Sequence, residues 1–252
     1  MVQKSLAARV DELTEQVKKL SGLARQVDAL KKEIKAKESR LAALEDIEAI
    51  QRLQCAYGYY LEHWMSEEII ACFSKSPEVS ATFVEGTYKG PEGIRRYFGR
   101  MPSAPPDFMH QVMQVSPVIT LDTKGTSARG RWYGYGALAL PAGKGARQLY
   151  MSVVYEMEYI KEEGIWKIFR LDLLMHYAYS PENGWVSPQK LKAAEIPAEP
   201  MKLNPDKWAE YETGYPSGFI LPHSFKHPVT GEETPETRIN AGLKLEPNRY
   251  RT

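Results

Sequence analysis

The chain has 252 residues, enough for one sizeable hydrophobic core with attached segments. Its 33 lysines and arginines balance 32 aspartates and glutamates, so the net charge of +1 indicates no nucleic-acid-binding face. Charged residues recur through the first 50 positions, which argues against a secretory signal peptide, and no apolar run reaches membrane-spanning length. The cysteines, Cys55 and Cys72, fall in predicted helices and are interpreted as buried thiols, so we expect a cytoplasmic protein without membrane contacts.

Residues 1–45 have the apolar spacing of a coiled-coil oligomerisation helix. Steps of three and four alternate along one seam, which consists of Val10, Leu13, Val17, Leu20, Leu23, Val27, Leu30, Ile34, Leu41 and Leu44. The alternation slips once beside Ser21 and Gly22, and Lys37 occupies one seam position. A solvated amphipathic helix is the alternative, but the heptads favour self-association. We expect no chemistry in this segment.

Residues 46–185 are predicted to form the main folded domain. Helical spacing continues over 46–64, and a shorter helix is predicted near 69–73. The segment EVSATFVEGTYKGPEGIRRYF predicts a strand, a glycine turn, a strand and a helix entered at Pro91. Four long strand candidates follow, with hairpin turns near 122–125, 141–145 and 162–164. Helices followed by such a meander indicate an α+β fold, a curved antiparallel sheet wrapped on helices into a cone with one apolar pocket.

Residues 186–252 are predicted to form an extended, proline-rich C-terminal arm. The chain after Ser180 contains 10 of the 17 prolines and has little periodicity. Its aromatic content is too high for a plain disordered tail. We therefore expect an arm that lies on a neighbouring surface.

Four segments together resemble the nuclear transport factor 2-like superfamily in its SnoaL-like branch. They are LEDIEAIQRLQCAYGYYLE, MHQVMQVSPVITLD, ARGRWY and YEMEYIKEEGIWKI, and the resemblance covers roughly residues 44–185. Within that branch the chain is similar to the bile acid 7α-dehydratases and to the cofactor-independent lyases that deformylate lignin-derived diarylpropanes. The proline-rich arm with HPVTG is absent from the short dehydratases, which favours the lyases.

The resemblance implies a lyase that converts a 1,2-diarylpropane-1,3-diol into a stilbene, formaldehyde and water through a quinone methide. A dehydratase of a hydroxysteroid or polyketide-like alcohol is the first alternative, and a non-catalytic binding module of small molecules is the second. The small subunit of a ring-hydroxylating dioxygenase is a further possibility. A homotrimer is implied, with a dimer as the alternative, assembled through the N-terminal helix and the sheet faces.

Four residues are candidates for catalysis. Tyr57 shares the apolar helix face and matches the catalytic tyrosine of the dehydratases, so the resemblance implies a general acid there. His110 opens a strand and matches the dehydratase histidine, whose ordinary pKa suits proton transfer near neutral pH. Glu62 matches a dehydratase aspartate, although five helical steps place it roughly 140° from Tyr57. Arg131 either holds a phenolate or pairs with an outer-face glutamate.

Substrate contacts are expected from the apolar helix face and from alternating strand positions. The candidates are Tyr60, Tyr133, Tyr135, Met151, Tyr155, Asp172 and His176. For Asp172 and His176 a subunit interface is the alternative, and Tyr59 and His63 are interpreted as surface residues. The five histidines show no metal-binding spacing, and no glycine-rich nucleotide motif is present. We therefore expect acid–base chemistry by side chains alone, on a small aromatic substrate, with no metal and no cofactor.

Overall fold

The computed structural model describes residues 5–100, 108–142, 145–181, 205–208, 225, 228 and 232–233. The chain divides into two compact units, Met1–Asp46 and Ile47–Thr252. The predicted C-terminal arm lies almost entirely outside the described residues, so its extended conformation stays a prediction. No helix in the described ranges combines the length and the apolar character that crossing a membrane requires.

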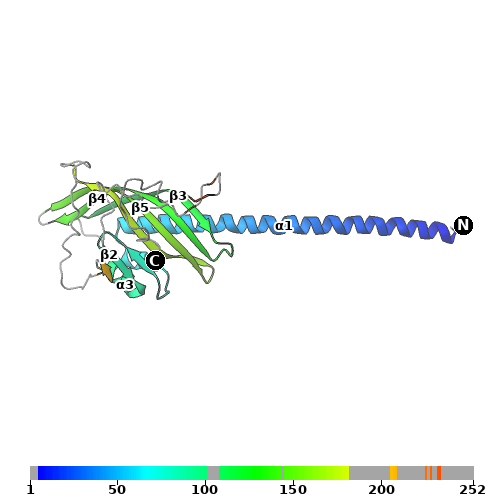
Figure 1. The fold of residues 1–252 in the computed structure, drawn as a ribbon, viewed down its shortest axis with the longest axis horizontal. Coiled ribbons are helices and arrows are strands. Elements are labelled where there is room, and N and C mark those ends of the chain that lie inside the picture. The colour runs from blue at the N-terminus through cyan, green and yellow to red at the C-terminus, as the bar shows by residue number, and fades with distance from the viewer. Residues whose placement is uncertain are drawn as a thin grey trace. The chain divides into compact units, whose positions relative to one another are not determined.

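Helix α1 runs from Leu6 to Glu62 and belongs to both units (Figure 1). In the first unit its apolar seam residues are exposed. In the second unit it buries one face, formed by residues three or four positions apart. These residues are Ile50, Gln54, Tyr57 and Leu61. The final turns of the helix therefore supply one wall of the core of the second unit.

Helix α1 ends in a left-handed residue that is not glycine. Trp64 has φ 45°, the Met65 amide donates to the Tyr60 carbonyl at 2.9 Å, and the Trp64 amide donates to the Leu61 carbonyl at 3.1 Å. This pair of bonds is the Schellman motif, whose left-handed position usually holds glycine. A bulky residue there costs about 1–3 kcal/mol. Burial of the Trp64 side chain, which is only 2% exposed, offsets that cost.

The second unit continues with short elements and then four long strands. They are α2 (Ser66–Ala71), β1 (Ser80–Thr82), β2 (Gly86–Lys89), α3 (Gly90–Phe98), β3 (Met109–Leu121), β4 (Ser127–Ala142), β5 (Gly145–Glu162), β6 (Ile165–Tyr179) and β7 (Lys207–Trp208). The predicted strand, turn, strand and proline-initiated helix are confirmed as β1, β2 and α3. The meander of long strands is confirmed as β3 to β6, and the turns expected near 122–125 and 162–164 are confirmed. The turn expected near 141–145 includes residues 143–144, which lie outside the described residues.

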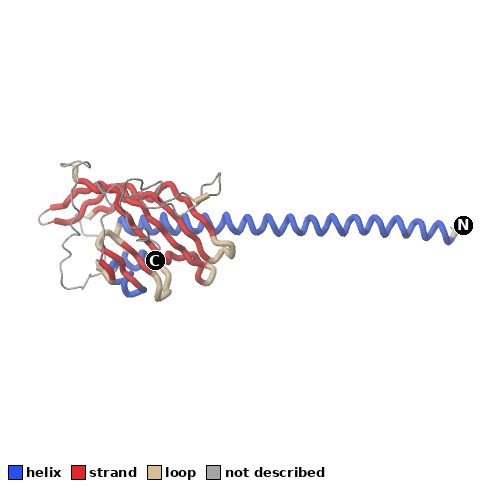
Figure 2. Tube along the Cα trace, viewed as in Figure 1, coloured by secondary structure: helices blue, strands red, loops and turns tan. Residues whose placement is uncertain are grey.

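The strands form one curved, mixed sheet in the order β3-β4-β5-β6-β1-β2-β7 (Figure 2). All neighbouring pairs are antiparallel except β1 and β6, which are parallel. The central register places Trp132 opposite Tyr155 and Tyr155 opposite Leu173. The fold is therefore α+β, as the sequence predicted.

The two faces of the sheet have different surroundings. The face here called the interior face carries Val112, Trp132, Tyr155 and Leu171, which belong to the buried cluster that also contains the buried side chains of α1, α2 and α3. The opposite face, called the outer face, carries the alternate residues of the same strands. Which of these two faces a strand residue occupies decides whether it can take part in an interior site.

Candidate active site

Tyr57 projects from α1 into the aromatic core and is 1% exposed. Its ring meets those of Phe73 and Phe98 edge-on, with centroids 6.0 and 6.1 Å apart. Burial, followed by the nearby phenols of Tyr155 and Tyr97, raises the pKa of Tyr57 well above its ordinary value. Three phenols thus gather in one apolar interior, and Tyr57 stays protonated at neutral pH.

His110 lies near the start of β3, paired with Leu138 on the interior side of the sheet. The Phe108 ring stacks near its imidazole, with centroids 6.4 Å apart and an interplanar angle of 15°. Its Nδ1 atom is buried and has no hydrogen-bond partner within the described residues. Burial lowers the pKa of His110 to about 4, and the positive charge of Arg100 acts in the same direction. The imidazole is therefore neutral at pH 7 and able to accept a proton.

Arg100 follows α3 and brings a positive charge to this interior. Its guanidinium carbon lies 4.3 Å from the ring centroid of Tyr97 and 4.6 Å from that of Trp64, both within cation–π range. It also hydrogen-bonds the Tyr97 side chain, and it is close enough to His110 to influence its titration. The sequence analysis missed Arg100 because the segment RRYFGR contains three arginines and no pattern separates one from the others.

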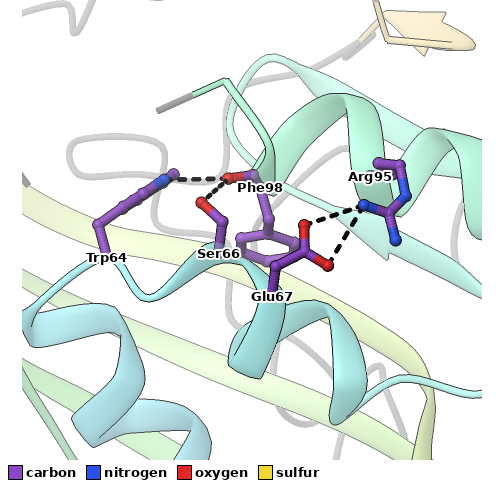
Figure 3. Close-up of polar contacts among 5 residues, drawn as sticks. All are labelled: Trp64, Ser66, Glu67, Arg95 and Phe98. Atoms are coloured by element: carbon purple, nitrogen blue, oxygen red, sulfur yellow. Dashed lines mark hydrogen bonds and ion pairs between the residues drawn. The ribbon is translucent and has the colours of Figure 1, made fainter. Parts of the chain in front are cut away.

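A set of polar contacts joins the end of α3 to Trp64 and to the first residues of α2 (Figure 3). The Phe98 carbonyl accepts hydrogen bonds from Trp64 Nε1 at 3.0 Å and from the Ser66 hydroxyl at 2.9 Å. On the solvent side, Arg95 pairs with Glu67 at 3.0 Å. The left-handed turn at Trp64 aims the indole at this carbonyl and also places it against Arg100. The left-handed conformation of Trp64 at the end of α1 thus helps to position Arg100 and the end of α3.

Tyr155 and Met151 lie on the interior face of β5, as the alternation predicted. Burial, with Tyr97 nearby, raises the pKa of Tyr155. The Tyr155 ring lies over Gly134, where a Cβ atom would come within 2.6 Å of its Cε2 atom and 2.5 Å of Val153. A glycine on β4 is therefore required to seat this ring.

A buried hydrogen-bond chain joins α1 to three strands beside the phenols. Trp132 Nε1 donates to the Tyr159 hydroxyl at 3.0 Å, and that hydroxyl donates to Gln54 Oε1 at 2.7 Å. Gln54 Nε2 in turn donates to the side-chain oxygen Oε1 of Gln114, and the Gln114 side chain comes close to α1 at Gly58. Because Gln54 is fully buried, this chain fixes the rotation of α1 against the sheet.

Arg131, Tyr133 and Tyr135 share one strand face as predicted, but it is the outer face. Trp132 between them points to the interior, and Arg131 Nη1 lies 2.6 Å from Glu156 Oε1. Both tyrosines are nearly half exposed. The structure therefore does not bring these three residues together with Tyr57 and His110. Of the two roles that the sequence left open for Arg131, the structure contains the ion pair.

Asp172 and His176 also lie on the outer face, away from the interior phenols. Asp172 is paired in register with Thr82 and hydrogen-bonds its side chain, and burial raises the pKa of this carboxyl. The His176 ring centroid is 5.9 Å from that of Tyr133, and burial, followed by the charge of Arg131, lowers the pKa of His176. His176 therefore lies near Arg131, whereas Asp172 lies near Thr82, Arg170 and Glu158.

The residues at the end of α1 are placed as follows. Tyr60 is partly buried and packs against the core, whereas Tyr59 is 67% exposed and His63 is exposed. Glu62 is the last residue of α1 and is partly exposed. No contact in the described part of the chain joins Glu62 to Tyr57, which agrees with their angular separation on the helix.

No cluster of three or more potential metal ligands occurs among the described residues. The interior instead holds phenols, an imidazole and a guanidinium. Such a set can donate hydrogen bonds, accept a proton and stabilise an anion. We call Tyr57, Tyr97, Arg100, His110 and Tyr155 the interior acid–base group.

Several solved structures are similar to this chain. One is a hexachlorocyclohexane dehydrochlorinase from Novosphingobium barchaimii, with 20% identity over 60% of this chain and 99% of that one and a TM-score of 0.46. A proposed scytalone dehydratase from Novosphingobium aromaticivorans has 18% identity over 55% and 89%, with a TM-score of 0.46. A nuclear transport factor 2-like protein with a cystatin-like fold from the same species has 16% identity over 54% and 86%, with a TM-score of 0.42.

The family comparison covers the region that contains the interior acid–base group. The SnoaL-like domain model matches residues 42–172, which is just over half of the 252 residues. This range includes the last turns of α1, both short helices and most of the sheet. The chain therefore belongs to the SnoaL-like domain family.

Proposed function

We propose that the protein is a cofactor-independent lyase acting on a para-hydroxylated 1,2-diarylpropane-1,3-diol, which it converts into a stilbene, formaldehyde and water. One observation carries the proposal: His110 has a buried Nδ1 without a described partner in an interior that also holds Arg100 and three phenols. The neutral imidazole has a free lone pair that can accept a phenolic proton, and the fixed cation favours ionisation of a bound phenol by stabilising its phenolate.

The first step in this proposal is ionisation of the substrate phenol. His110 takes the para-hydroxyl proton, and Arg100 stabilises the resulting phenolate by a charge-assisted hydrogen bond. Cation–π contacts of Arg100 with the Trp64 and Tyr97 rings hold its guanidinium in place before substrate arrives. This assigns to Arg100 the role that the sequence analysis offered to Arg131, whose guanidinium lies on the outer face.

The second step is loss of the benzylic hydroxyl. Electrons from the phenolate form a quinone methide, the benzylic carbon–oxygen bond breaks, and Tyr57 gives its proton to the departing oxygen to form water. The elevated pKa of Tyr57 has two consequences. Tyr57 is a weak acid, so it gives up its proton only as electron donation from the substrate phenolate breaks the benzylic carbon–oxygen bond. The tyrosinate that results is a strong base.

The third step is release of formaldehyde. The Tyr57 phenolate takes the proton of the terminal hydroxyl, the adjacent carbon–carbon bond breaks, and its electrons reduce the quinone methide to the stilbene phenolate. His110 returns its proton to that phenolate. Tyr57 and His110 thus end in their starting forms, and the atoms of the diol are fully recovered in stilbene, formaldehyde and water. The quinone methide serves as the electron sink.

Purified full-length protein incubated with the diol, without added cofactor or metal, tests the proposal. We expect stilbene absorbance and formaldehyde to rise in equal amounts. A substrate with a para-methoxy group should not react, because it cannot form the quinone methide. Water loss without formaldehyde would replace this proposal by a dehydratase, and binding without turnover would replace it by a binding module.

Matched variants then test the assigned roles. Replacement of His110 by Gln should lower kcat by about 10²–10⁴, the usual worth of a general acid or base. Tyr57→Phe and Arg100→Met should each lower kcat as well. Tyr133→Phe on the outer face is the control and should retain the wild-type rate. Equal losses in Tyr133→Phe and Tyr57→Phe would contradict the interior location of the chemistry.

A further inference from the structure

The first unit of the chain displays a long apolar stripe. Eleven large apolar side chains on one side of α1 are between 47% and 80% exposed. They are Leu6, Val10, Leu13, Val17, Leu20, Leu23, Val27, Leu30, Ile34, Leu41 and Leu44. Most helical stability in proteins comes from packing of an apolar face, and no described residue of the first unit covers this one. The stripe therefore requires a partner.

The stripe has different residue types at its two heptad positions, a and d, counted on either side of the slip at Ser21 and Gly22. Position a is β-branched in four of five cases, and its residues are Val10, Val17, Val27, Ile34 and Leu41. The residues at position d are leucine except for Lys37. β-Branched residues at a with leucine at d favour two parallel strands over three or four. The same sequence in a second copy provides this pattern in register.

We propose that the occupant of the stripe is a second copy of this chain, aligned in parallel over Leu6–Leu44 as a two-stranded coiled coil. This proposal does not depend on the proposed chemistry. It replaces the homotrimer implied by resemblance with a homodimer, because the distribution of β-branched and leucine side chains selects two strands.

The charged residues of the helix fit this arrangement. Lys37 would meet its own copy at a d layer, and Lys37 Nζ already lies 2.7 Å from Glu33 Oε1 in the same chain. That ion pair partly neutralises the positive charge of Lys37 in the d layer. It also neutralises Glu33 at position g, which reduces the repulsion between Glu33 and Glu38 at position e of the second copy. One heptad later, Arg40 at position g faces Glu45 at position e of the second copy, an attractive pair.

Light scattering during size-exclusion chromatography of the full-length protein tests the strand number. We expect twice the mass of one chain, which is 28.6 kDa. Leu30→Lys should shift the mass towards a single chain, whereas Lys32→Glu, on the far side of the helix, should leave it unchanged. A three-chain mass, or a two-chain mass that survives Leu30→Lys, would overturn the proposal.

Cysteine cross-linking tests the orientation. Cys55 was predicted to be buried but is exposed, and it is first replaced by Ser. In that background Leu13→Cys should form a disulfide-linked dimer on mild oxidation, because parallel strands place each d residue beside its copy. Glu15→Cys, on the outside of the coil, should not cross-link. Antiparallel strands would hold position 13 of one copy far from position 13 of the other. Absence of a cross-link from Leu13→Cys, or equal cross-linking of both variants, would therefore contradict the parallel coil.

Discussion

Arg131 Nη1 lies 2.6 Å from Glu156 Oε1, on the sheet face opposite the ring of Tyr155. The two side chains are only 8% and 16% exposed, so water screens this ion pair weakly. The ion pair and the interior acid–base group thus lie on opposite faces of the same sheet. A substitution in the pair can therefore change the stability of the fold without touching the proposed catalytic residues.

Replacement of Arg131 by Met should destabilise the fold and spare the chemistry. Glu156 would lose this partner in a poorly solvated position, and removal of one member of a buried pair costs about 3–5 kcal/mol. Urea unfolding would measure the loss. The double variant Arg131→Met/Glu156→Met should recover most of it. A large drop in kcat for the folded single variant would instead support the phenolate-binding role first considered for Arg131.

His110 should make the protein less stable in mild acid. Its folded pKa is about 4 because burial disfavours the charged ring, whereas an unfolded histidine titrates near 6.5. Between about pH 6.5 and pH 4, His110 is protonated in the unfolded chain but not in the folded chain. The free energy of unfolding therefore falls as the pH drops below about 6.5, and it stops falling below about pH 4. Between pH 7 and about pH 4.5 the loss should be roughly 2–3 kcal/mol.

Comparison of wild type with His110→Gln isolates this effect. Unfolding free energies would be measured for both proteins at pH 7 and at about pH 4.5. The decrease in the free energy of unfolding between these pH values should be smaller in the variant, because His110 no longer contributes to it. His63→Gln is the matched control, since His63 is exposed. Identical pH dependence in wild type and His110→Gln would show that His110 ionises freely, and would remove its proposed role as a neutral base.

Tyr57 and Tyr159 are both fully buried tyrosines but differ in what their hydroxyls do. The Tyr159 hydroxyl accepts from Trp132 and donates to Gln54, whereas no hydrogen bond joins the Tyr57 hydroxyl to a described residue. Tyr159→Phe should therefore cost about 1–3 kcal/mol for the groups left unpaired, and Tyr57→Phe should be within about 0.5 kcal/mol of wild type. Thermal unfolding of both variants would measure this. Equal destabilisation would indicate a structural partner for Tyr57.

The sequence predicted the fold well because its signals are local. The heptads, the proline at the start of α3 and the glycine turns each act within a few residues, and all correspond to observed elements. Alternation also showed which β4 residues share a face. It could not show which face points inward, because that depends on pairing Trp132 with Tyr155, 23 positions along the chain.

The site was predicted in part for the same reason. Tyr57 belongs to a helical stripe of apolar residues, and its burial follows from that stripe. Arg100 contacts the ring of Trp64, which has a left-handed backbone conformation and is hydrogen-bonded to the end of α3. A non-glycine residue with positive φ has no reliable sequence signature. The sequence analysis therefore considered Arg131 on β4 as the cation and did not consider Arg100, which follows α3.

Two glycines offer a final, paired prediction. At Gly134 an added Cβ would lie 2.5 Å from Val153 and 2.6 Å from Tyr155, and both side chains are buried with no room to move outward. Gly134→Ala should cost about 1–3 kcal/mol by overpacking and should displace the Tyr155 ring, so the proposed conversion of the diol should slow with it. At Gly22 nothing lies within 4 Å, and Gly22→Ala should stabilise α1 by about 1 kcal/mol. Far-UV circular dichroism during thermal unfolding would measure both changes. A neutral Gly134→Ala would mean that the ring of Tyr155 can relocate without loss.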